Sequence, residues 1–575
     1  MHQATWLPTA LIFLTGCLAS WDRPPPVVHS PTGMYLGNSS ISNLDQFLGI
    51  PYAKPPVGPL RFSNPVAVER VPFTSINATE YSPGCLQDPV YSRYNGLSED
   101  CLTLNIIRPR RTAKSNAKLP VLFWIHGGGN MNGQSIFYNG TALVQYSIAI
   151  SQPIIYVGIN YRLAGFGFLN SPDFNALGLS NNGLRDQRLA LEWTHENIAS
   201  FGGDPEKVTI FGESAGAFDS WAQLHYAYVK NETNKYFRGM ISNSGSPGSV
   251  AAPHAYTPES GLAAYRELLS ATNCSLASDN ISCLRAVPVD TLAPLLVNYS
   301  AHFSVDYDWF SDNLTSLLVA NEVAPIPIIH GANLNEGAVF LPSIFPDSAI
   351  PTKKDLITYI APFVNSSIEL ASVVAEIYFN GSVCLDELGR NFNGDATAPD
   401  SYWRAVAIWS DTLFHLGRRA LLRNACARGV PVWGYHFDQT PPLSLLDEDY
   451  EYPGFNQSYA RRIGVFHGSD IAYYFGAVSG LKGSTDGDVA VSTIMMRAWI
   501  SFTYHLDPNA KGVPSWPGYC EGLKVINGSI QDVGTAMFFA QQGDQKIEVR
   551  PDTVRQAAYD VWNYARQAQG LSRIY

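Results

Sequence analysis

The residues with the clearest chemical potential lie in segment 212–216, which reads Gly-Glu-Ser-Ala-Gly. An apolar run of strand type, residues 208–211, precedes it, and an alanine-rich segment compatible with a helix begins at Ala215. In the order strand, sharp turn, helix, a Gly-x-Ser-x-Gly motif lifts the serine hydroxyl clear of a sheet, and its glycines leave room for crowded backbone. The motif predicts Ser214 as a nucleophile. The alternative is a glycine-rich turn without a chemical role.

A serine hydroxyl is a weak nucleophile, so it needs a base that accepts its proton. The last third of the chain contains His415, His436, His467 and His505. The first and last of these lie in helical patterns, and His436 lies in a strand pattern that is typical of a packed core histidine. His467 has glycines nearby on both sides, in the segment 464–468. Such a loop can deliver an imidazole over the serine, and we predict His467 as the base.

The acid that orients the base is predicted at Glu336. It lies in Asn-Leu-Asn-Glu-Gly, residues 333–337, just after an apolar run at 324–329. A carboxylate just past a strand end can reach the distal nitrogen of the imidazole, hold its tautomer and stabilise the imidazolium. The chain order serine, acid, histidine is the one expected for this topology. The alternative for Glu336 is a surface loop carboxylate.

Backbone amides must also hold the oxyanion that forms during acyl transfer. The glycine loop after the apolar run 118–125 supplies Gly128 and Gly129, and Ala215 follows the nucleophile. We expect these three amides to form the oxyanion hole. His126 is expected to have a structural role in the loop, and Glu213 is expected to be a buried hydrogen-bonded strut.

Strands that alternate with helices position these residues. The pattern predicts a mostly parallel sheet with helices on both faces, and ligands bind such sheets beyond the carboxyl ends of the strands. The expected strands are 118–125, 152–161, a run from 208, 239–246, 324–329 and 430–437, and the expected helices are 182–200, 493–505 and 554–569. Without a low-complexity linker or internal repeat in the sequence, we expect residues 20–575 to form a single α/β domain with long insertions.

Composition and charge restrict the partners. The formal net charge is −11, and the basic residues are scattered rather than gathered in a stripe, which argues against nucleic-acid binding. After the N-terminus, no stretch approaches the roughly 20 apolar residues of a membrane span, and the last residues show no hydrophobic anchor tail. The histidine and cysteine spacings suggest no metal site. We expect no cofactor, no metal and no stable membrane anchor.

The N-terminus resembles a secretory signal peptide. Residues 6–19 are apolar, too few to span a membrane, and end in small residues, so we predict a signal peptide at 1–19. The alternative is a bacterial lipoprotein box at 14–17. Twelve Asn-x-Ser/Thr sequons favour a secreted eukaryotic glycoprotein with N-glycans. They begin at Asn38, Asn77, Asn139, Asn231, Asn273, Asn280, Asn298, Asn313, Asn365, Asn380, Asn456 and Asn527.

Seven cysteines remain after the predicted signal peptide. In an oxidising compartment close neighbours are the easiest to bridge, which makes Cys85–Cys101 and Cys274–Cys283 natural pairs, although sequence does not prove connectivity. Cys384, Cys426 and Cys520 are left, so one of these three must stay free or pair between chains.

The chain resembles the type-B carboxylesterases, the group that includes cholinesterases and secreted fungal lipases and has an α/β-hydrolase fold. The matching segments are FLGIPYAKPPVGPLRF (47–62), EDCLTLNIIRP (99–109), HGGGN (126–130), residues 181–216, NEG (335–337), GVFHGSDIAYYFG (464–476), DPN (507–509) and SWP (515–517). The resemblance implies Ser214 as nucleophile, Glu336 as acid and His467 as base. It also implies oxyanion amides at Gly128, Gly129 and Ala215, and the two short-range disulfides named above.

Departures from the family pattern narrow the expected substrate. The first disulfide loop of the cholinesterases carries a tryptophan that stacks on the choline cation, and the loop 86–100 has none, which leaves only Tyr91 and Tyr94 as a weaker platform. In the fungal lipases this loop is a long flap, whereas fifteen residues separate Cys85 from Cys101 here. We therefore expect a secreted esterase for soluble short-chain or aromatic esters. The alternatives are a triacylglycerol lipase and a non-catalytic binding module.

Overall fold

The computed structural model describes most of the chain. The described residues are 25–71, 73–110, 118–246, 258–312, 316–317, 322–341, 352–379, 400–446, 463–523, 525–526, 529–530, 533–541 and 546–568. The predicted signal peptide at 1–19, Cys384 and the sequons at Asn313, Asn380, Asn456 and Asn527 lie outside these ranges.

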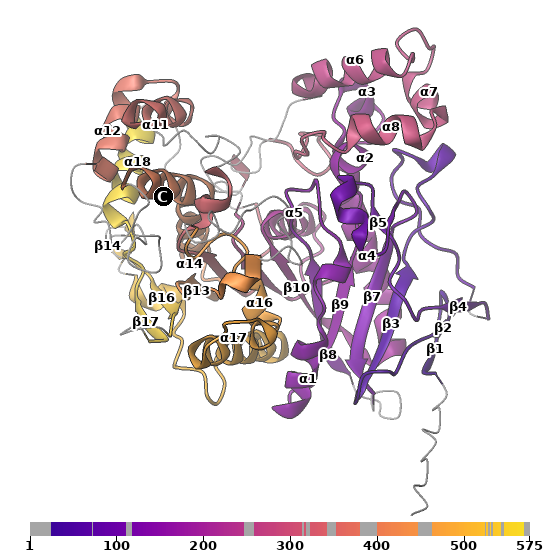
Figure 1. Cartoon of the computed structure of the whole chain (residues 1–575), viewed down its shortest axis with the longest axis horizontal. Helices are drawn as coiled ribbons and strands as arrows, with labels where there is room; N and C mark the ends of the chain where they lie inside the picture. The colour runs from indigo at the N-terminus through magenta and orange to yellow at the C-terminus, as the bar shows by residue number, and fades with distance from the viewer. Residues whose placement is uncertain are drawn as a thin grey trace, which may run out of the picture.

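A ten-stranded sheet runs through the molecule (Figure 1). In spatial order its strands are β17 (Glu548–Pro551), β16 (Thr535–Phe539), β13 (Val432–Phe437), β12 (Ile328–Asn333), β11 (Gly239–Asn243), β10 (Gly203–Glu213), β8 (Leu119–Ile125), β9 (Ile155–Ile159), β7 (Thr103–Pro109) and β3 (Leu44–Pro51). The neighbours from β16 to β9 pair in parallel, and only β17, β7 and β3 add antiparallel pairs at the two ends. The predicted mostly parallel sheet is confirmed.

Alternating side chains of the central strands divide the core into two layers. In β8, Leu122 and Trp124 belong to one buried cluster, whereas Val121 and Phe123 belong to the other. Because successive strand residues point to opposite faces, a strand that is apolar on both faces must be covered on both sides. The continuous apolar runs of this sequence therefore require two helical layers.

Helices supply both layers. On one face, α4 (Asn182–Asn197) and α5 (Ala215–Val229) pack against the strands β8 and β10. On the other, α17 (Asp486–His505) covers the same two strands and α1 (Thr141–Ala149) covers β7. The nucleophile segment thus lies where a central strand meets a helix that is packed on the sheet.

Two peripheral groups of helices account for the predicted insertions. One group gathers α2 (Ala164–Phe168), α3 (Pro172–Ala176), α6 (Leu262–Ala271), α7 (Asn280–Ala286) and α8 (Val289–Leu296) around a separate apolar cluster (Figure 1, upper right). The other gathers α11 (Lys353–Ile360), α12 (Ile368–Phe379), α13 (Asp400–Ser410) and α18 (Gln556–Ala568) at the opposite end of the sheet.

Several elements differ in their bounds from the sequence expectation, and for two of them, β12 and α17, the sequence contains the reason. The strand expected at 324–329 begins only at Ile328, because Pro325 and Pro327 have no N–H to donate to a ladder. The helix expected from 493 already begins at Asp486. Thr485 caps it, since its hydroxyl accepts a bond from the backbone N–H of Asp488, whose carboxylate in turn binds the Thr485 backbone.

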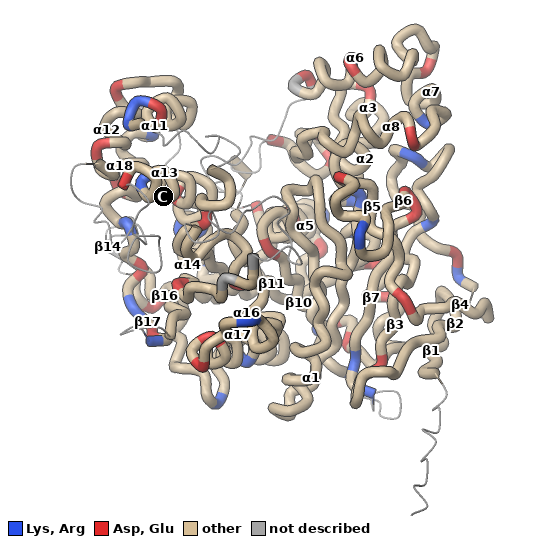
Figure 2. The backbone as a smooth tube through the Cα atoms, in the orientation of Figure 1, with Lys and Arg blue, Asp and Glu red and all other residues tan. Residues whose placement is uncertain are grey.

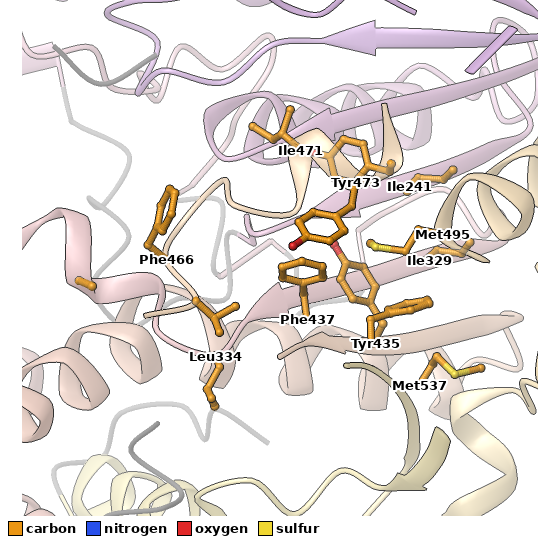
Figure 3. Packing of buried hydrophobic residues seen from close by; sticks show 14 of the residues in the cluster. Ile241, Ile329, Leu334, Tyr435, Phe437, Phe466, Ile471, Tyr473, Met495 and Met537 are labelled. Atoms are coloured by element: carbon orange, nitrogen blue, oxygen red, sulfur yellow. The ribbon is translucent and has the colours of Figure 1, made fainter. Parts of the chain in front are cut away.

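Aromatic packing joins the late strands to the segment after the predicted base. The rings of Phe437 in β13 and Tyr473 in α16 (Ile471–Tyr474) lie close together (Figure 3), with centroids 4.8 Å apart at 67°. Leu334 and Phe466, which flank the predicted acid and base, belong to the same buried cluster. This core therefore supports the loops that carry both functional groups.

Three disulfides link described residues: Cys85–Cys101, Cys274–Cys283 and Cys426–Cys520. The third closes a separation of 94 residues, a pairing that the sequence left open. Lys and Arg are interspersed with Asp and Glu along the backbone (Figure 2). Among the described helices, none has both the length and the apolar character needed to cross a bilayer.

Candidate active site

Ser214 lies at the turn between β10 and α5. Its backbone has φ 54° and ψ −125°, a conformation that a non-glycine residue adopts only when its surroundings impose it. The Ser214 N–H donates to the carbonyl of Asn243 at 3.0 Å, and the Ser214 carbonyl accepts from Ala217 at 3.0 Å. The turn is therefore held both by the neighbouring strand and by the first turn of the helix.

The two glycines of the motif are explained by close backbone approach. A Cβ atom at Gly212 would lie 2.2 Å from the carbonyl oxygen of Gly216, and a Cβ at Gly216 would lie 2.1 Å from that of Ile125. These neighbours are backbone atoms of helix α5 and of strand β8, so they cannot move aside as the end of a flexible side chain could. The local sequence thus follows from the tight passage of strand into helix.

His467 and Glu336 meet although 131 residues separate them. Nδ1 of His467 lies 2.6 Å from Oε2 of Glu336. The carboxylate is fully buried, and its Oε1 accepts a 2.6 Å bond from the backbone N–H of Asn333. Glu336 opens the short 3-10 helix η7 (Glu336–Val339), just beyond β12. Both carboxylate oxygens are therefore occupied, and the side chain is fixed.

A backbone bridge aligns the two loops. The N–H of Asn335 donates to the carbonyl of Val465 at 2.9 Å, and Oδ1 of Asn335 accepts from the Val465 N–H at 3.1 Å. Asn333 adds a third link, because its Nδ2 donates to the carbonyl of Phe466 at 2.8 Å. The residues on either side of the acid thus clamp the segment that precedes the base.

Glu213 makes a contact that the sequence interpretation did not anticipate. Its Oε1 lies 3.3 Å from Nε2 of His467, and the residue is 3% exposed. Because Glu213 immediately precedes Ser214, this contact puts the Nε2 side of the imidazole beside the turn at residues 212–216, the nucleophile elbow. The buried position expected for Glu213 is confirmed, and its carboxylate in addition contacts the imidazole. Its position beside the nucleophile was the only signal in the sequence.

Aromatic side chains flank the imidazole. The ring centroids of Phe414 and Phe340 lie 4.7 Å and 5.2 Å from that of His467. Trp409 stacks on Phe340 at 5.7 Å. These rings restrict the orientation of the imidazole and give its surroundings an apolar, aromatic character.

The glycine loop lies against the elbow. A Cβ at Gly127 would lie 2.8 Å from Cβ of Ser214, so the loop that follows β8 touches the nucleophile segment. Gly128 and Gly129 adopt φ 102° and 65°, and both are exposed. Within the described part of the chain, their amides have no hydrogen-bond acceptor. Ala215 is the first residue of α5, whose first N–H groups have no intrahelical acceptor. These amides could bind an anionic oxygen.

The other histidines have different surroundings. His436 Nε2 bonds to Oδ1 of Asp552 at 2.8 Å, inside the sheet layer, and burial lowers the pKa of His436 to about 3. His415 is buried beside it, and burial lowers its pKa as well. His505 ends α17, where its Nε2 lies 2.9 Å from Nε2 of Gln152. Burial lowers the pKa of His126 to about 4, and its ring stacks on Tyr161 at 4.5 Å.

A second buried carboxylate, that of Asp470, lies near the predicted acid Glu336. Asp470 accepts hydrogen bonds from Nδ2 of Asn333 at 3.3 Å and from the hydroxyl of Tyr435 at 3.0 Å. Burial and, to a lesser extent, the nearby charge of Glu336 raise the pKa of Asp470 to about 7. The sequence analysis did not single out Asn333 or Asp470. Only their spacing of three residues from Glu336 and from His467 distinguishes them.

Comparisons with known proteins agree with this arrangement. The sequence profile of the carboxylesterase family matches residues 24–536. Secreted lipase 1 of Botryotinia fuckeliana (strain B05.10) is 35% identical over 551 residues, with 88% of this chain and 89% of that protein covered. Carboxylesterase 1D of Rattus norvegicus is 30% identical over 568 residues, with 91% of this chain and 94% of that protein covered.

Two further comparisons cover most of the chain. Secreted triacylglycerol lipase LIP1 of Gibberella zeae is 32% identical over 545 residues, with 86% of this chain and 85% of that protein covered. The crystal structure of EstA from Aspergillus niger is similar with a TM-score of 0.76 at 25% sequence identity, with 95% of this chain and 99% of that chain covered.

Proposed function

Because the chain belongs to the carboxylesterase family and is a carboxylic ester hydrolase of the serine type, we propose that Ser214, His467 and Glu336 are its catalytic triad. The observation that carries this assignment is the 2.6 Å bond between Nδ1 of His467 and Glu336. That bond leaves Nε2 of the imidazole on the side of the elbow. The amides of Gly128, Gly129 and Ala215 are proposed as the oxyanion hole.

The proposed reaction has two halves. Ser214 Oγ attacks the ester carbonyl carbon while His467 Nε2 accepts the hydroxyl proton, and the amides hold the negative oxygen of the tetrahedral intermediate. The intermediate collapses as His467 gives its proton to the leaving alcohol, which leaves an acyl-enzyme on Ser214. Water then attacks this acyl group with the same base, and the carboxylic acid is released. Glu336 stabilises the imidazolium in both halves.

The finer substrate assignment is a soluble ester with a short-chain or aromatic acyl group. It is supported by the way the first disulfide loop is fixed. Nε2 of Gln87, a fully covered side chain, donates to the Gly133 carbonyl at 2.9 Å, and Gly133 N–H donates back to Oε1 of Gln87 at 2.8 Å. The ring of Tyr94 packs on Phe137 at 4.7 Å. A short loop tied down in this way is unsuited to open as a flap at an oil surface.

The aromatic surroundings of the base support the acyl preference. Phe340 and Phe414 lie beside the imidazole of His467. The imidazole must lie close to the ester during proton transfer, so the two rings are near the bound substrate. Aromatic rings contact other aromatic groups favourably through offset stacking and edge-to-face contacts. This supports an aromatic acyl group, whereas the preference for a short acyl chain rests on the fixed disulfide loop.

Secretion and domain organisation belong to the same proposal. We propose that residues 1–19 are removed as a signal peptide and that residues 20–575 form one hydrolase domain that carries N-glycans. The names of the relatives from Botryotinia fuckeliana and Gibberella zeae, both called secreted, support export. The exposed sequon residues Asn77, Asn139, Asn231, Asn273, Asn298 and Asn365 offer sites for glycans.

Initial rates on p-nitrophenyl esters of increasing acyl length, beside emulsified triolein, test the proposal. We expect a maximum at short or aromatic acyl groups, smooth saturation and no turnover of triolein. Ser214→Ala should remove activity in a protein with unchanged thermal stability. A triacylglycerol lipase is the second candidate, favoured by the name of the Gibberella zeae relative, secreted triacylglycerol lipase LIP1. A rate that jumps above the solubility limit of a long-chain ester would support it instead.

A further inference from the structure

An oxyanion hole built from two separate segments needs a device that fixes the distance between them. Here one set of amides is carried by the loop after β8, and the other by the first turn of α5. Effective stabilisation requires the donors to lie about 2.7–3.1 Å from the developing oxyanion. A loop of consecutive glycines has wide conformational freedom and does not hold such a position by itself.

Asn130 ends the glycine loop and is 5% exposed. Its backbone is left-handed, with φ 57°, and its carbonyl accepts a 2.7 Å bond from the N–H of Ala164. Its side chain turns away from solvent. The Nδ2 atom donates to Oδ1 of Asp219 at 3.0 Å. The residue that closes the loop is thus held at both its main chain and its side chain.

Asp219 belongs to α5, the helix that begins immediately after Ser214. The carboxylate is fully buried. Its second oxygen, Oδ2, accepts from Nε2 of Gln187 in α4 at 2.5 Å, and Nε2 of Gln223 lies 3.3 Å from Oε1 of Gln187. An ionised carboxylate accepts hydrogen bonds and donates none, and bonds to a charged group are about twice as strong as neutral ones.

Tyr161 completes the arrangement from the end of β9. Its hydroxyl lies 2.9 Å from Oδ1 of Asn130 and 2.8 Å from the carbonyl oxygen of His126, and it shares its proton between these two acceptors. The start and the end of the glycine loop are therefore tied to one hydroxyl.

We propose that Asn130 and Asp219 are positioning residues. Their hydrogen bond fixes the position of the glycine loop relative to the N-terminus of α5. The inference rests on the proposed function, because it concerns the oxyanion hole of that reaction. Neither side chain contacts the substrate. Their bond makes the helix that supplies the Ala215 amide also hold the loop that supplies the Gly128 and Gly129 amides.

The test separates binding of the oxyanion from binding of the rest of the substrate. A trifluoromethyl ketone forms a hemiketal oxyanion on the serine, whereas the matching secondary alcohol does not.

Asn130→Ala and Asp219→Asn should lower kcat by about 10- to 100-fold, in line with partial loss of an oxyanion donor, with KM changed less than threefold. Affinity for the ketone should fall by the same factor and affinity for the alcohol should stay unchanged. Assays at pH 8 keep Asp219 ionised, since burial raises its pKa to about 7.

A reversed pair provides the rescue. In the double variant Asn130→Asp/Asp219→Asn the acceptor and donor exchange places, so the bond can form again and Tyr161 can donate to the new carboxylate. This variant should recover kcat and ketone affinity to within about fivefold of the wild type. Ser220→Ala is the matched control, because that buried hydroxyl of α5 donates to the carbonyl of Gly216, at 2.7 Å, within its own helix and makes no other hydrogen bond among the described residues.

The outcomes distinguish the two proposals. Unchanged ketone affinity and kcat in folded Asp219→Asn, or equal losses for ketone and alcohol, would overturn the role of the pair while leaving the triad in place. Failure of the reversed pair to recover any activity in a folded protein would also overturn it. If the wild type itself neither hydrolyses esters nor binds the ketone, the proposed function fails and the positioning role fails with it.

Discussion

Nδ1 of His467 lies 2.6 Å from Oε2 of Glu336, while the other oxygen of that carboxylate accepts the backbone N–H of Asn333. The two bonds assign the two oxygens to different donors. An amide in place of the carboxylate would turn its oxygen to the Asn333 N–H, which leaves its NH2 group facing the imidazole.

For Glu336→Gln this arrangement predicts the wrong imidazole tautomer. The NH2 group would force Nδ1 to accept, so Nε2 would carry the proton and could not act as a base. We expect kcat to fall by about 10³- to 10⁴-fold, as for the equivalent change in a serine protease triad. Steady-state kinetics on a p-nitrophenyl ester, with thermal unfolding as the fold control, measures this. A loss below tenfold would show that Glu336 does not orient the base.

Gly216→Ala should prevent the elbow from forming. The new Cβ would lie 2.1 Å from the Ile125 carbonyl oxygen, which is part of the central strand β8. We expect loss of activity together with a large fall in Tm or failure to accumulate as soluble protein. Gly480→Ala is the matched control, because a Cβ there meets no atom within 4 Å. Equal behaviour of the two variants would contradict the steric explanation of the motif.

Asp552→Asn should lower the free energy of unfolding, although Asp552 has no role in the proposed reaction. The buried carboxylate accepts from Arg418 at 2.7 Å, from Arg419 at 3.1 Å and from the Tyr519 hydroxyl at 3.0 Å. Removing its charge leaves two guanidinium groups buried with too little compensation, at a cost of about 3–5 kcal/mol. Urea unfolding measures this, and Glu69→Gln, which breaks an exposed pair with Lys54, should leave the midpoint unchanged. Similar midpoints for both variants would refute the prediction.

Buried histidines should make the protein less stable in acid. Burial lowers the pKa of His330 to about 3, and its Nδ1 lies 2.9 Å from the Ser242 carbonyl oxygen. Between about pH 6.5, where an unfolded histidine titrates, and pH 3, the unfolded chain binds a proton that the folded chain does not. The free energy of unfolding therefore falls as pH falls, by about 1.4 kcal/mol per pH unit for one such histidine.

His330→Asn isolates this contribution, since its amide can still donate to the Ser242 carbonyl and does not titrate. Urea unfolding at pH 7.5, 6 and 5 should give a shallower dependence than the wild type, by about the contribution of one proton. An identical slope in the variant would show that His330 gains its proton equally in both states.

The sequence by itself determined those structural elements that depend on interactions between residues close together in the chain. The elbow could be predicted from five residues, because the strand–turn–helix order is visible in the sequence and Gly212 crowds Gly216, only four residues away. The α/β fold, with a sheet covered by helices on both faces, followed from apolar runs that alternate with helical patterns. The bounds of β12 and α17 were less accurate, because prolines and a capping threonine changed where regular hydrogen bonding begins.

Only the tertiary structure decided the contacts between distant segments. The Glu213 carboxylate beside His467, the Cys426–Cys520 disulfide and the Asn130–Asp219 bond join residues 254, 94 and 89 positions apart. A polar side chain gives no sign in one sequence of which distant partner satisfies it, since that depends on how strands order themselves in the sheet. The residue types that carry the chemistry are therefore readable from the chain, whereas their charge environment and their relative positions arise from packing.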